Sequence, residues 1–270
     1  METEKREQFQ RAELLLGKEA MERLYTSHVA IFGIGGVGGY VAEALARCGV
    51  GAFTLIDNDK IALSNMNRQI IATMDTIGRN KTDVMRERIL SVNPKAQVEV
   101  RNCFFLPENA AEFDFTKYNY VVDAIDTVTA KIQLVLQAGE AGAPIISCMG
   151  TGNKLQPQRL EITDLYKTSV CPLAKVMRRE LKKRGVKALK VLYSNEEPLI
   201  PGAKDKAKVE QETYCGTRAE MARQKEEEVT TEAQMPAPGR RTVPGSVSFV
   251  PPAAGLMIAG EVIKDLTDVR

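Results

Sequence analysis

Two short motifs carry most of the chemistry that this sequence offers. Gly33-Ile34-Gly35-Gly36-Val37-Gly38 directly follows an apolar run at residues 29–32. Glycine lets a backbone approach phosphate closely, and a helix starting after such a turn presents free N–H groups. Asn65-Met66-Asn67-Arg68-Gln69 then adds an arginine, which a protein that only holds a dinucleotide rarely needs. The pair predicts a site that binds a nucleoside triphosphate and attacks it.

An acidic residue completes the fingerprint of a nucleotide-binding turn. Asp57 ends the next apolar run, residues 53–56, where an acid accepts hydrogen bonds from ribose hydroxyls. The competing interpretation of the glycines is a turn that only packs closely. Two interpretations of Asp59 stay open: a solvated acid in a loop, or a residue that contacts ribose or metal-bound water.

Further polar residues are expected to meet the nucleotide at the same edge of a sheet. Asn65, Arg68 and Lys81 are candidates for binding phosphates, because arginine forks onto phosphate oxygens and lysine adds a point charge. Asp126 follows a predicted strand and suits Mg²⁺, which takes one or two carboxylates plus phosphate oxygens. Spacing alone leaves open that Arg68 and Lys81 form ordinary surface ion pairs.

Alternating strands and helices must position these residues. Apolar periodicity predicts a Rossmann-like, doubly wound and mainly parallel sheet with helices on both faces, extended by a mixed C-terminal part. The predicted strands are residues 29–32, 53–56, 98–100, 120–125, 144–149, 160–163, 188–193 and 246–250. The predicted helices are residues 7–24, with Leu14, Leu15 and Leu24 on an apolar side, and residues 41–48, 81–92, 130–141, 172–184 and 253–266.

We expect one domain over residues 1–270. Its nucleotide-binding half is residues 1–150, and its substrate-facing half is residues 151–270. The second half includes a polar, mobile loop at residues 203–241.

Composition limits the possible partners and compartments. The net charge of +2 excludes a global field for polyanions, so nucleic acid would need a local patch. Five cysteines without a CxxC pair argue against a disulfide framework and a four-cysteine zinc site, and fit the cytoplasm. Residues 242–260 carry no charge, so membrane association there is a minor alternative to a buried strand and helix.

With these residues in place, the chain resembles the ATP-dependent adenylating enzymes related to ubiquitin-activating enzyme and to the ThiF, MoeB and HesA proteins. The matching residues are the glycine motif, Asp57-Asn58-Asp59, residues 65–69, Lys81 and Asp123-Ala124-Ile125-Asp126. The resemblance implies that Asp57 holds the ribose, that Asn65, Arg68 and Lys81 bind phosphates and that Asp126 holds magnesium. It also implies a homodimer in which Arg11 reaches the neighbouring subunit's site.

Within this superfamily, residues 6–17, 120–126, 162–165 and 245–251 resemble the branch of tRNA threonylcarbamoyladenosine dehydratases. That likeness implies ATP-dependent cyclisation of N6-threonylcarbamoyladenosine beside the anticodon, through adenylation of the threonyl carboxylate. No zinc is expected, since the substrate's own ureido group closes onto the activated carboxylate. The sequence leaves open whether a cysteine desulfurase or its sulfur acceptor associates.

A basic stripe in the predicted helix 172–184 is the candidate tRNA surface, against the alternative of a merely solvated face. Its members are Lys175, Arg178, Arg179, Lys182 and Lys183, extended by Arg184, Lys187 and Lys190. His28 and Cys171 are interpreted as structural residues.

Three rival functions stay open at this point. The first is an adenylyltransferase acting on the C-terminus of a sulfur-carrier or ubiquitin-like protein. The second is a dinucleotide-dependent oxidoreductase, in which Arg68 and Lys81 would be idle. The third is a non-catalytic scaffold for nucleotide and RNA.

Overall fold

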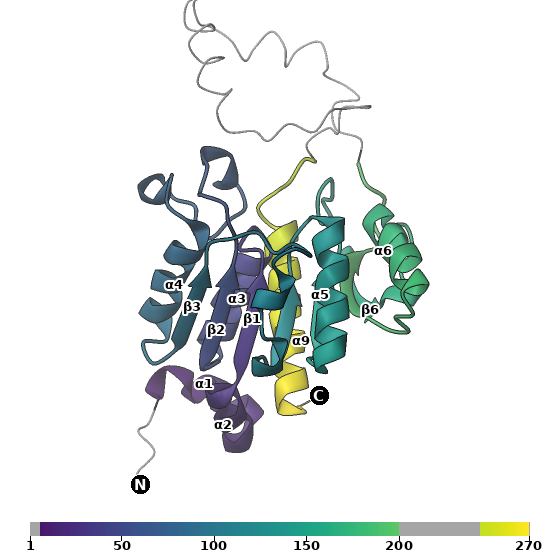
Figure 1. Ribbon diagram of the computed structural model, residues 1–270. Coiled ribbons are helices and arrows are strands. Elements are labelled where there is room, and N and C mark those ends of the chain that lie inside the picture. The colour runs from purple at the N-terminus through teal and green to yellow at the C-terminus, as the bar shows by residue number, and fades with distance from the viewer. Residues whose placement is uncertain (1–5, 200–243, 270) are drawn as a thin grey trace, which may run out of the picture. The chain divides into compact units, whose positions relative to one another are not determined.

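A seven-stranded sheet forms the centre of the computed structural model, which describes residues 6–199 and 244–269 (Figure 1). The strand order is β3-β2-β1-β4-β5-β7-β6, and only the β6–β7 pair is antiparallel. The predicted α/β class is therefore confirmed, including the mixed C-terminal part. The strands are β1 (His28–Phe32), β2 (Ala52–Ile56), β3 (Gln97–Arg101), β4 (Tyr120–Asp123), β5 (Ile145–Cys148), β6 (Leu160–Asp164) and β7 (Lys190–Ser194).

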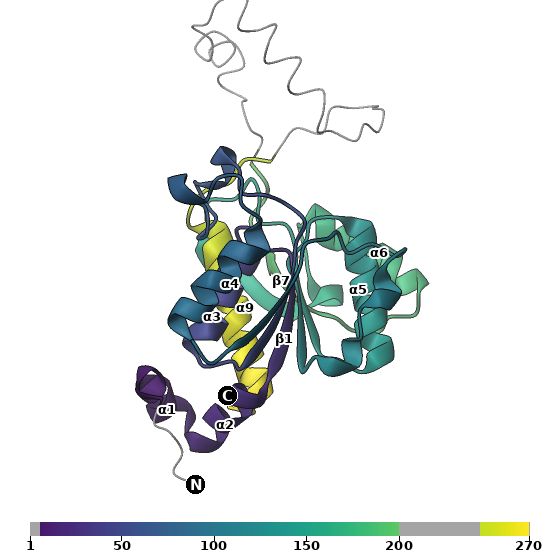
Figure 2. The same cartoon turned by 60° about the vertical axis from the view of Figure 1, so that its left-hand side comes forward.

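Helices cover both faces of this sheet (Figure 2). On one face lie α3 (Gly38–Arg47), α4 (Lys81–Val92) and α9 (Val250–Thr267), and on the other lie α5 (Val128–Ala141) and α6 (Pro172–Lys183). Two further helices, α1 (Gln10–Leu16) and α2 (Lys18–Thr26), precede β1. The described residues 6–198 and 246–269 belong to one compact unit.

The central strand β1 shows why a continuous apolar run is needed. Successive side chains of a strand point to opposite faces, so a strand covered on both sides must be apolar throughout. Val29 and Ile31 pack into the core beneath α3 and α9, while Ala30 and Phe32 pack into the core beneath α5. All four are fully buried.

The prediction of one helix over residues 7–24 is wrong. Gly17 adopts φ 84°, which ends α1 and starts α2 in a new direction. Leu14 and Leu15 are each 85% exposed rather than on a buried side, because the apolar face is carried by α2 through Met21 and Leu24.

The predicted strand at residues 246–250 is also absent. These residues run without regular structure until α9 begins at Val250, three residues before the predicted helix start at Ala253. Pro251 and Pro252 occupy the first turn, where a missing N–H costs nothing and the fixed φ already suits a helix. No helix of the described residues has the length and apolarity required to cross a membrane. The predicted loop at residues 203–241 lies outside the described part of the chain.

Candidate active site

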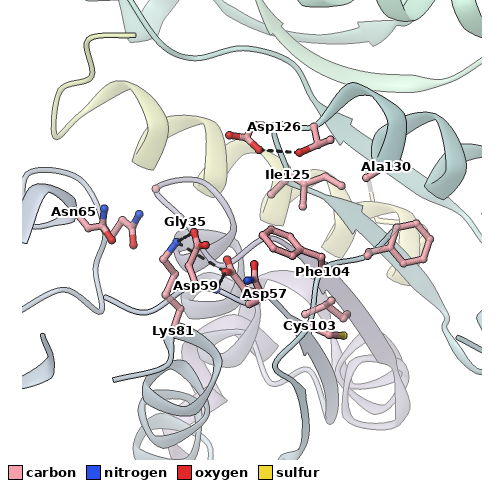
Figure 3. A pocket seen from close by; sticks show the side chains of 18 of the residues that line it. Gly35, Asp57, Asp59, Asn65, Lys81, Cys103, Phe104, Ile125, Asp126 and Ala130 are labelled. Carbon is pink, nitrogen blue, oxygen red and sulfur yellow. Dashed lines mark hydrogen bonds and ion pairs between the residues drawn. The ribbon is translucent and has the colours of Figure 1, made fainter. Parts of the chain in front are cut away.

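A pocket of about 300 Å³ opens at the carboxyl ends of β1, β2 and β4 (Figure 3). This is the edge of an open α/β sheet at which ligands bind. All four residues of the predicted phosphate cluster line it, namely Asn65, Arg68, Lys81 and Asp126. Gly33, Gly35, Gly36, Asp57, Asp59 and Gln69 line it as well. Separate loops thus bring the residues of both motifs to one cavity.

The glycine turn is packed too tightly for any side chain at two of its positions. Gly33 has φ 91°, and a Cβ there would lie 2.6 Å from the backbone oxygen of Ala124. A Cβ on Gly38 would lie 1.8 Å from the backbone oxygen of Gly33. Gly38 does not line the pocket, and its role is to let α3 begin against the turn. Gly36 faces the cavity with Arg68 and Pro251 beside it.

Asp57 is fixed by the backbone on both of its oxygens. Oδ2 accepts from the Ile34 N–H at 2.7 Å and Oδ1 accepts from the Asp59 N–H at 2.8 Å. Burial raises the pKa of Asp57, and the positive charge of Lys81 is the largest influence that lowers it again. The result is a preoriented acceptor at the position that the sequence assigns to ribose.

Lys81 lies between two carboxylates. Its Nζ is 2.5 Å from Asp59 Oδ2 and 3.9 Å from Asp57 Oδ1. The Lys81 side chain is almost fully buried, whereas that of Asp59 is 57% exposed. The start of α4 holds this arrangement. The Lys81 N–H donates to the Asp59 carbonyl, and Asn80 and Lys60 form an isolated antiparallel β-bridge.

Arg68 is held by its own loop. Nη1 donates to the Ser64 carbonyl at 3.0 Å and to Asn67 Oδ1 at 2.9 Å. Asn65 Oδ1 accepts from the Ala62 N–H, which fixes the turn before it. Gln69 is buried, and its Oε1 has no hydrogen-bond partner among the described residues. A buried acceptor without a partner, beside the glycine turn, marks a place where a ligand could donate.

The far side of the pocket is apolar and was missed by the sequence analysis. Phe104, Leu106, Ile125 and Ala130 line it, and Phe104 lies across the cavity from Asn65 (Figure 3). The available signal was the run Cys103-Phe104-Phe105-Leu106 after β3. These surfaces suit the flat ring of a nucleobase.

The loop that carries Asp126 begins two residues earlier than predicted. The predicted strand 120–125 ends at Asp123, so Ala124 and Ile125 leave the sheet and carry Asp126 into the pocket. Asp126 is exposed, and its Oδ1 is 3.5 Å from Thr127 Oγ1. An exposed single carboxylate facing a phosphate-sized cavity fits the needs of a hydrated Mg²⁺.

A buried polar network supports that loop, and sequence reasoning did not identify it. Lys131 Nζ and the Asp123 carboxylate pair at 2.9 Å with both side chains fully buried. Lys131 also donates to the Cys148 carbonyl at 2.8 Å, and Ser147 Oγ donates to Asp123 at 2.5 Å. The network ties β4, α5 and β5 together directly behind the loop of Asp126. The lysine sits in a helix whose other inward residues are apolar, so its burial has little signature in the residue pattern.

Two groups of predicted site residues lie outside the pocket. Arg11 is exposed on α1, and α1 and α2 lead into the start of β1, at the opposite end of the strands from the pocket (Figure 1). The basic residues of α6 also do not line it. Within α6, Arg178 is half-buried and bonds to Thr168. Arg179, Lys183 and Arg184, which directly follows α6, form ion pairs with Glu180.

Lys175, Lys182 and Lys187 are exposed and form no ion pair within the described residues. Lys190 pairs with Glu261 and Asp265. The unpaired charge of the basic stripe is therefore concentrated in fewer residues than the sequence pattern contains.

The remaining candidates have structural surroundings. His28 Nε2 is 2.9 Å from Thr54 Oγ1, its ring meets the edge of Tyr118, and burial lowers its pKa. Cys171 is buried at the start of α6. Among residues 6–199 and 244–269, no three His, Cys, Asp or Glu side chains gather in a way that could hold a metal ion.

Comparison with known proteins identifies relatives over nearly the whole chain. Residues 8–270 match the ThiF family. The tRNA threonylcarbamoyladenosine dehydratase of Bacillus subtilis is 39% identical over 260 residues, which is 96% of this chain and 94% of that protein. The Escherichia coli protein of the same name is 41% identical over 177 residues, covering 66% of each chain. The crystal structure of the E. coli enzyme in complex with ATP superposes with a TM-score of 0.79 at 30% identity, covering 97% of this chain and 95% of that one.

Proposed function

The chain belongs to the ThiF family, and from this premise we propose that it is an ATP-dependent tRNA threonylcarbamoyladenosine dehydratase. The observation that carries the proposal is the convergence of Asn65, Arg68, Lys81 and Asp126 on one pocket beside the glycine turn. Relatives with this name span nearly the full chain, and one of them has been crystallised with ATP and another time with AMP. Both observations support adenylate chemistry on a tRNA substrate.

The proposed first step activates the threonyl carboxylate of N6-threonylcarbamoyladenosine. A carboxylate oxygen attacks the α-phosphorus of ATP, the bond to pyrophosphate breaks, and a mixed anhydride with AMP forms. Arg68 and Lys81 stabilise the negative charge that spreads over the phosphate oxygens, and Asn65 donates to them. Gly35 and Gly36 let the phosphates lie against the turn, while Asp57 accepts from the ribose hydroxyls.

The adenine base would occupy the apolar side of the pocket. Phe104, Leu106 and Ile125 offer flat and aliphatic surfaces there, opposite the polar residues that face the phosphates. Asp126 would hold Mg²⁺, which supplies charge neutralisation at the phosphates when it is bound. The apolar contacts orient the nucleotide so that the α-phosphorus faces the mouth of the pocket.

The second step is cyclisation within the substrate. The ureido group closes onto the activated carboxyl carbon, and AMP leaves with the oxygen that the carboxylate contributed. The net change in the nucleoside is the loss of one water. Because both reacting groups belong to one molecule, proximity lowers the barrier without a thiol nucleophile from the protein.

Arg11 can contribute to the proposed reaction only if a second subunit is present. It stands on α1 at the far end of the strands from its own pocket, so it would serve the site of a second subunit. The exposed Leu14 and Leu15 on the same helix offer apolar surface for the contact. We therefore propose a homodimer in which each α1 approaches the partner's phosphates.

Mass spectrometry of tRNA nucleosides tests the function directly. Purified protein is incubated with MgATP and tRNA carrying N6-threonylcarbamoyladenosine, and the nucleosides are then analysed. The expected result is a product lighter by one water, formed with one AMP per turnover. Pyrophosphate exchange with a sulfur-carrier protein but not with this tRNA would favour the rival adenylyltransferase.

A further inference from the structure

Among the described residues, only two aromatic side chains are exposed to solvent. They are Phe104, at 60%, and Phe249, at 48%. Phe104 lines the apolar side of the nucleotide pocket. Phe249 stands elsewhere, immediately before α9, and the chemistry described above gives it no task.

The segment that carries Phe249 lies next to residues that line the phosphate side of the pocket, although it does not line the pocket itself. Asn67 Nδ2 donates to the Ser246 carbonyl at 2.9 Å, and Pro251 packs against Gly36. Gly36 and Arg68 line the pocket, so residues 246–251 run beside the motif that faces the phosphates. In Figure 3, α9 begins on the same side of the pocket as Asn65, across from Phe104.

The backbone at this position is firmly held. The Phe249 carbonyl accepts from the Ala253 N–H, Val250 is fully buried, and two prolines follow in the first helical turn. An aromatic ring on a fixed backbone loses little further conformational entropy when it binds. Half of its surface nevertheless remains in water, which is costly for an aromatic side chain that has only a packing role.

We propose that Phe249 is a stacking platform for a base of the anticodon loop. The inference rests on the proposed function, because the reacting carboxylate hangs from a tRNA base and must reach the α-phosphorus. That base must therefore lie at the mouth, on the side where the phosphates are. Recognition of single-stranded RNA commonly uses unstacked bases lying on aromatic rings, and Phe249 presents such a ring there.

Three substitutions separate stacking from simple packing. Phe249→Ala and Phe249→Leu are both expected to raise KM for the modified tRNA about tenfold to a hundredfold, because neither side chain has a π-face. Phe249→Trp is expected to keep KM near that of the wild type. The Kd for ATP should stay unchanged in all three, which also shows that the pocket is folded.

Leu256→Ala is the matched control. Leu256 lies in α9, directly after the segment of Phe249, and is apolar and 51% exposed, and its replacement should leave KM for tRNA unchanged. A wild-type KM for Phe249→Ala or Phe249→Leu, in a protein that dehydrates the tRNA normally, would overturn the stacking role. Loss of the dimer in sedimentation experiments when Phe249 is replaced would also overturn it, because the ring would then contact a second copy of the chain. Absence of dehydration by the wild-type protein would instead reject the proposed function itself.

Discussion

Lys81 holds Asp59 at 2.5 Å while it remains 3.9 Å from the buried Asp57. One cation thus interacts with two carboxylates. The exposed Asp59 can give up this partner to water at little cost, whereas Asp57 cannot. We therefore expect the lysine to turn toward phosphates while its charge still acts on Asp57.

The first prediction concerns the pH dependence of ATP binding. Burial raises the pKa of Asp57 and Lys81 opposes that rise. The ionised Asp57 is the stronger acceptor for ribose hydroxyls, so affinity falls as the pH falls through the raised pKa. Lys81→Met removes the opposing charge, and we expect the midpoint of the loss to move to higher pH. Titration calorimetry from about pH 4.5 to 8 measures it, since that range lies above the ordinary pKa of an aspartate.

The exposed neighbour Lys60 provides the control for this titration. Lys60→Met removes the same charge from the adjoining loop and should leave the midpoint in place. An unchanged midpoint in Lys81→Met would show that Asp57 does not govern binding.

The raised pKa of Asp57 also affects the stability of the fold. Folding becomes less favourable as the pH rises through that pKa, because the folded state then binds more protons than the unfolded state.

The second prediction concerns the phosphate cluster. Arg68→Ala and Asp126→Ala should each reduce ATP-dependent turnover about a hundredfold or more, because each removes charge stabilisation in the transition state. Release of AMP and pyrophosphate reports the rate, and circular dichroism confirms folding. Arg68→Lys should not restore activity, since an ammonium group lacks the bidentate fork. Turnover at the wild-type rate in either alanine variant would remove the assigned role.

The third prediction concerns the buried pair behind the Asp126 loop. Lys131→Met leaves the Asp123 carboxylate buried without its cation, and we expect a loss of about 3–5 kcal/mol in the free energy of unfolding. Urea denaturation measures the loss. The double variant Asp123→Asn with Lys131→Met should recover part of it, because no charge is then stranded. Lys117→Met, which breaks an exposed pair with Asp114, should change stability little, and an equal loss there would contradict the explanation.

The fourth prediction concerns the candidate tRNA surface on α6. Lys175 and Lys182 are exposed and have no carboxylate partner in the described structure, so they are free to meet phosphates. Lys175→Glu with Lys182→Glu should weaken tRNA binding and flatten its dependence on salt, because fewer counterions are released. Fluorescence anisotropy at several salt concentrations tests this.

Arg178 is expected to behave differently from these lysines. Its guanidinium bonds to Thr168, so we expect Arg178→Ala mainly to lower the melting temperature, with a smaller effect on tRNA affinity. Lys18→Glu with Lys117→Glu alters the net charge equally and serves as the control. If that control weakens tRNA binding as strongly, the effect is general electrostatics rather than a surface on α6.

Sequence patterns predicted the sheet well because each buried strand must be apolar on both faces, as in β1. The pocket residues were also predictable, since they follow strands at one edge of a parallel sheet. Three features were not. Gly17, which divides residues 7–24 into two helices, interrupts no apolar pattern. The residues at the start of α9 have the composition of a strand, and Lys131 has the pattern of a solvent-facing lysine in an apolar helix. Each depends on contacts between distant segments, which local periodicity does not record.

The last helix has a consequence for how the enzyme is made. Pro251 packs against Gly36 of the glycine turn, although more than two hundred residues separate them in the chain. A ribosome must therefore translate past residue 251 before this contact can form. Until then, the growing polypeptide exposes the apolar side of α3 that α9 later covers, and we expect chaperones to bind this exposed apolar surface.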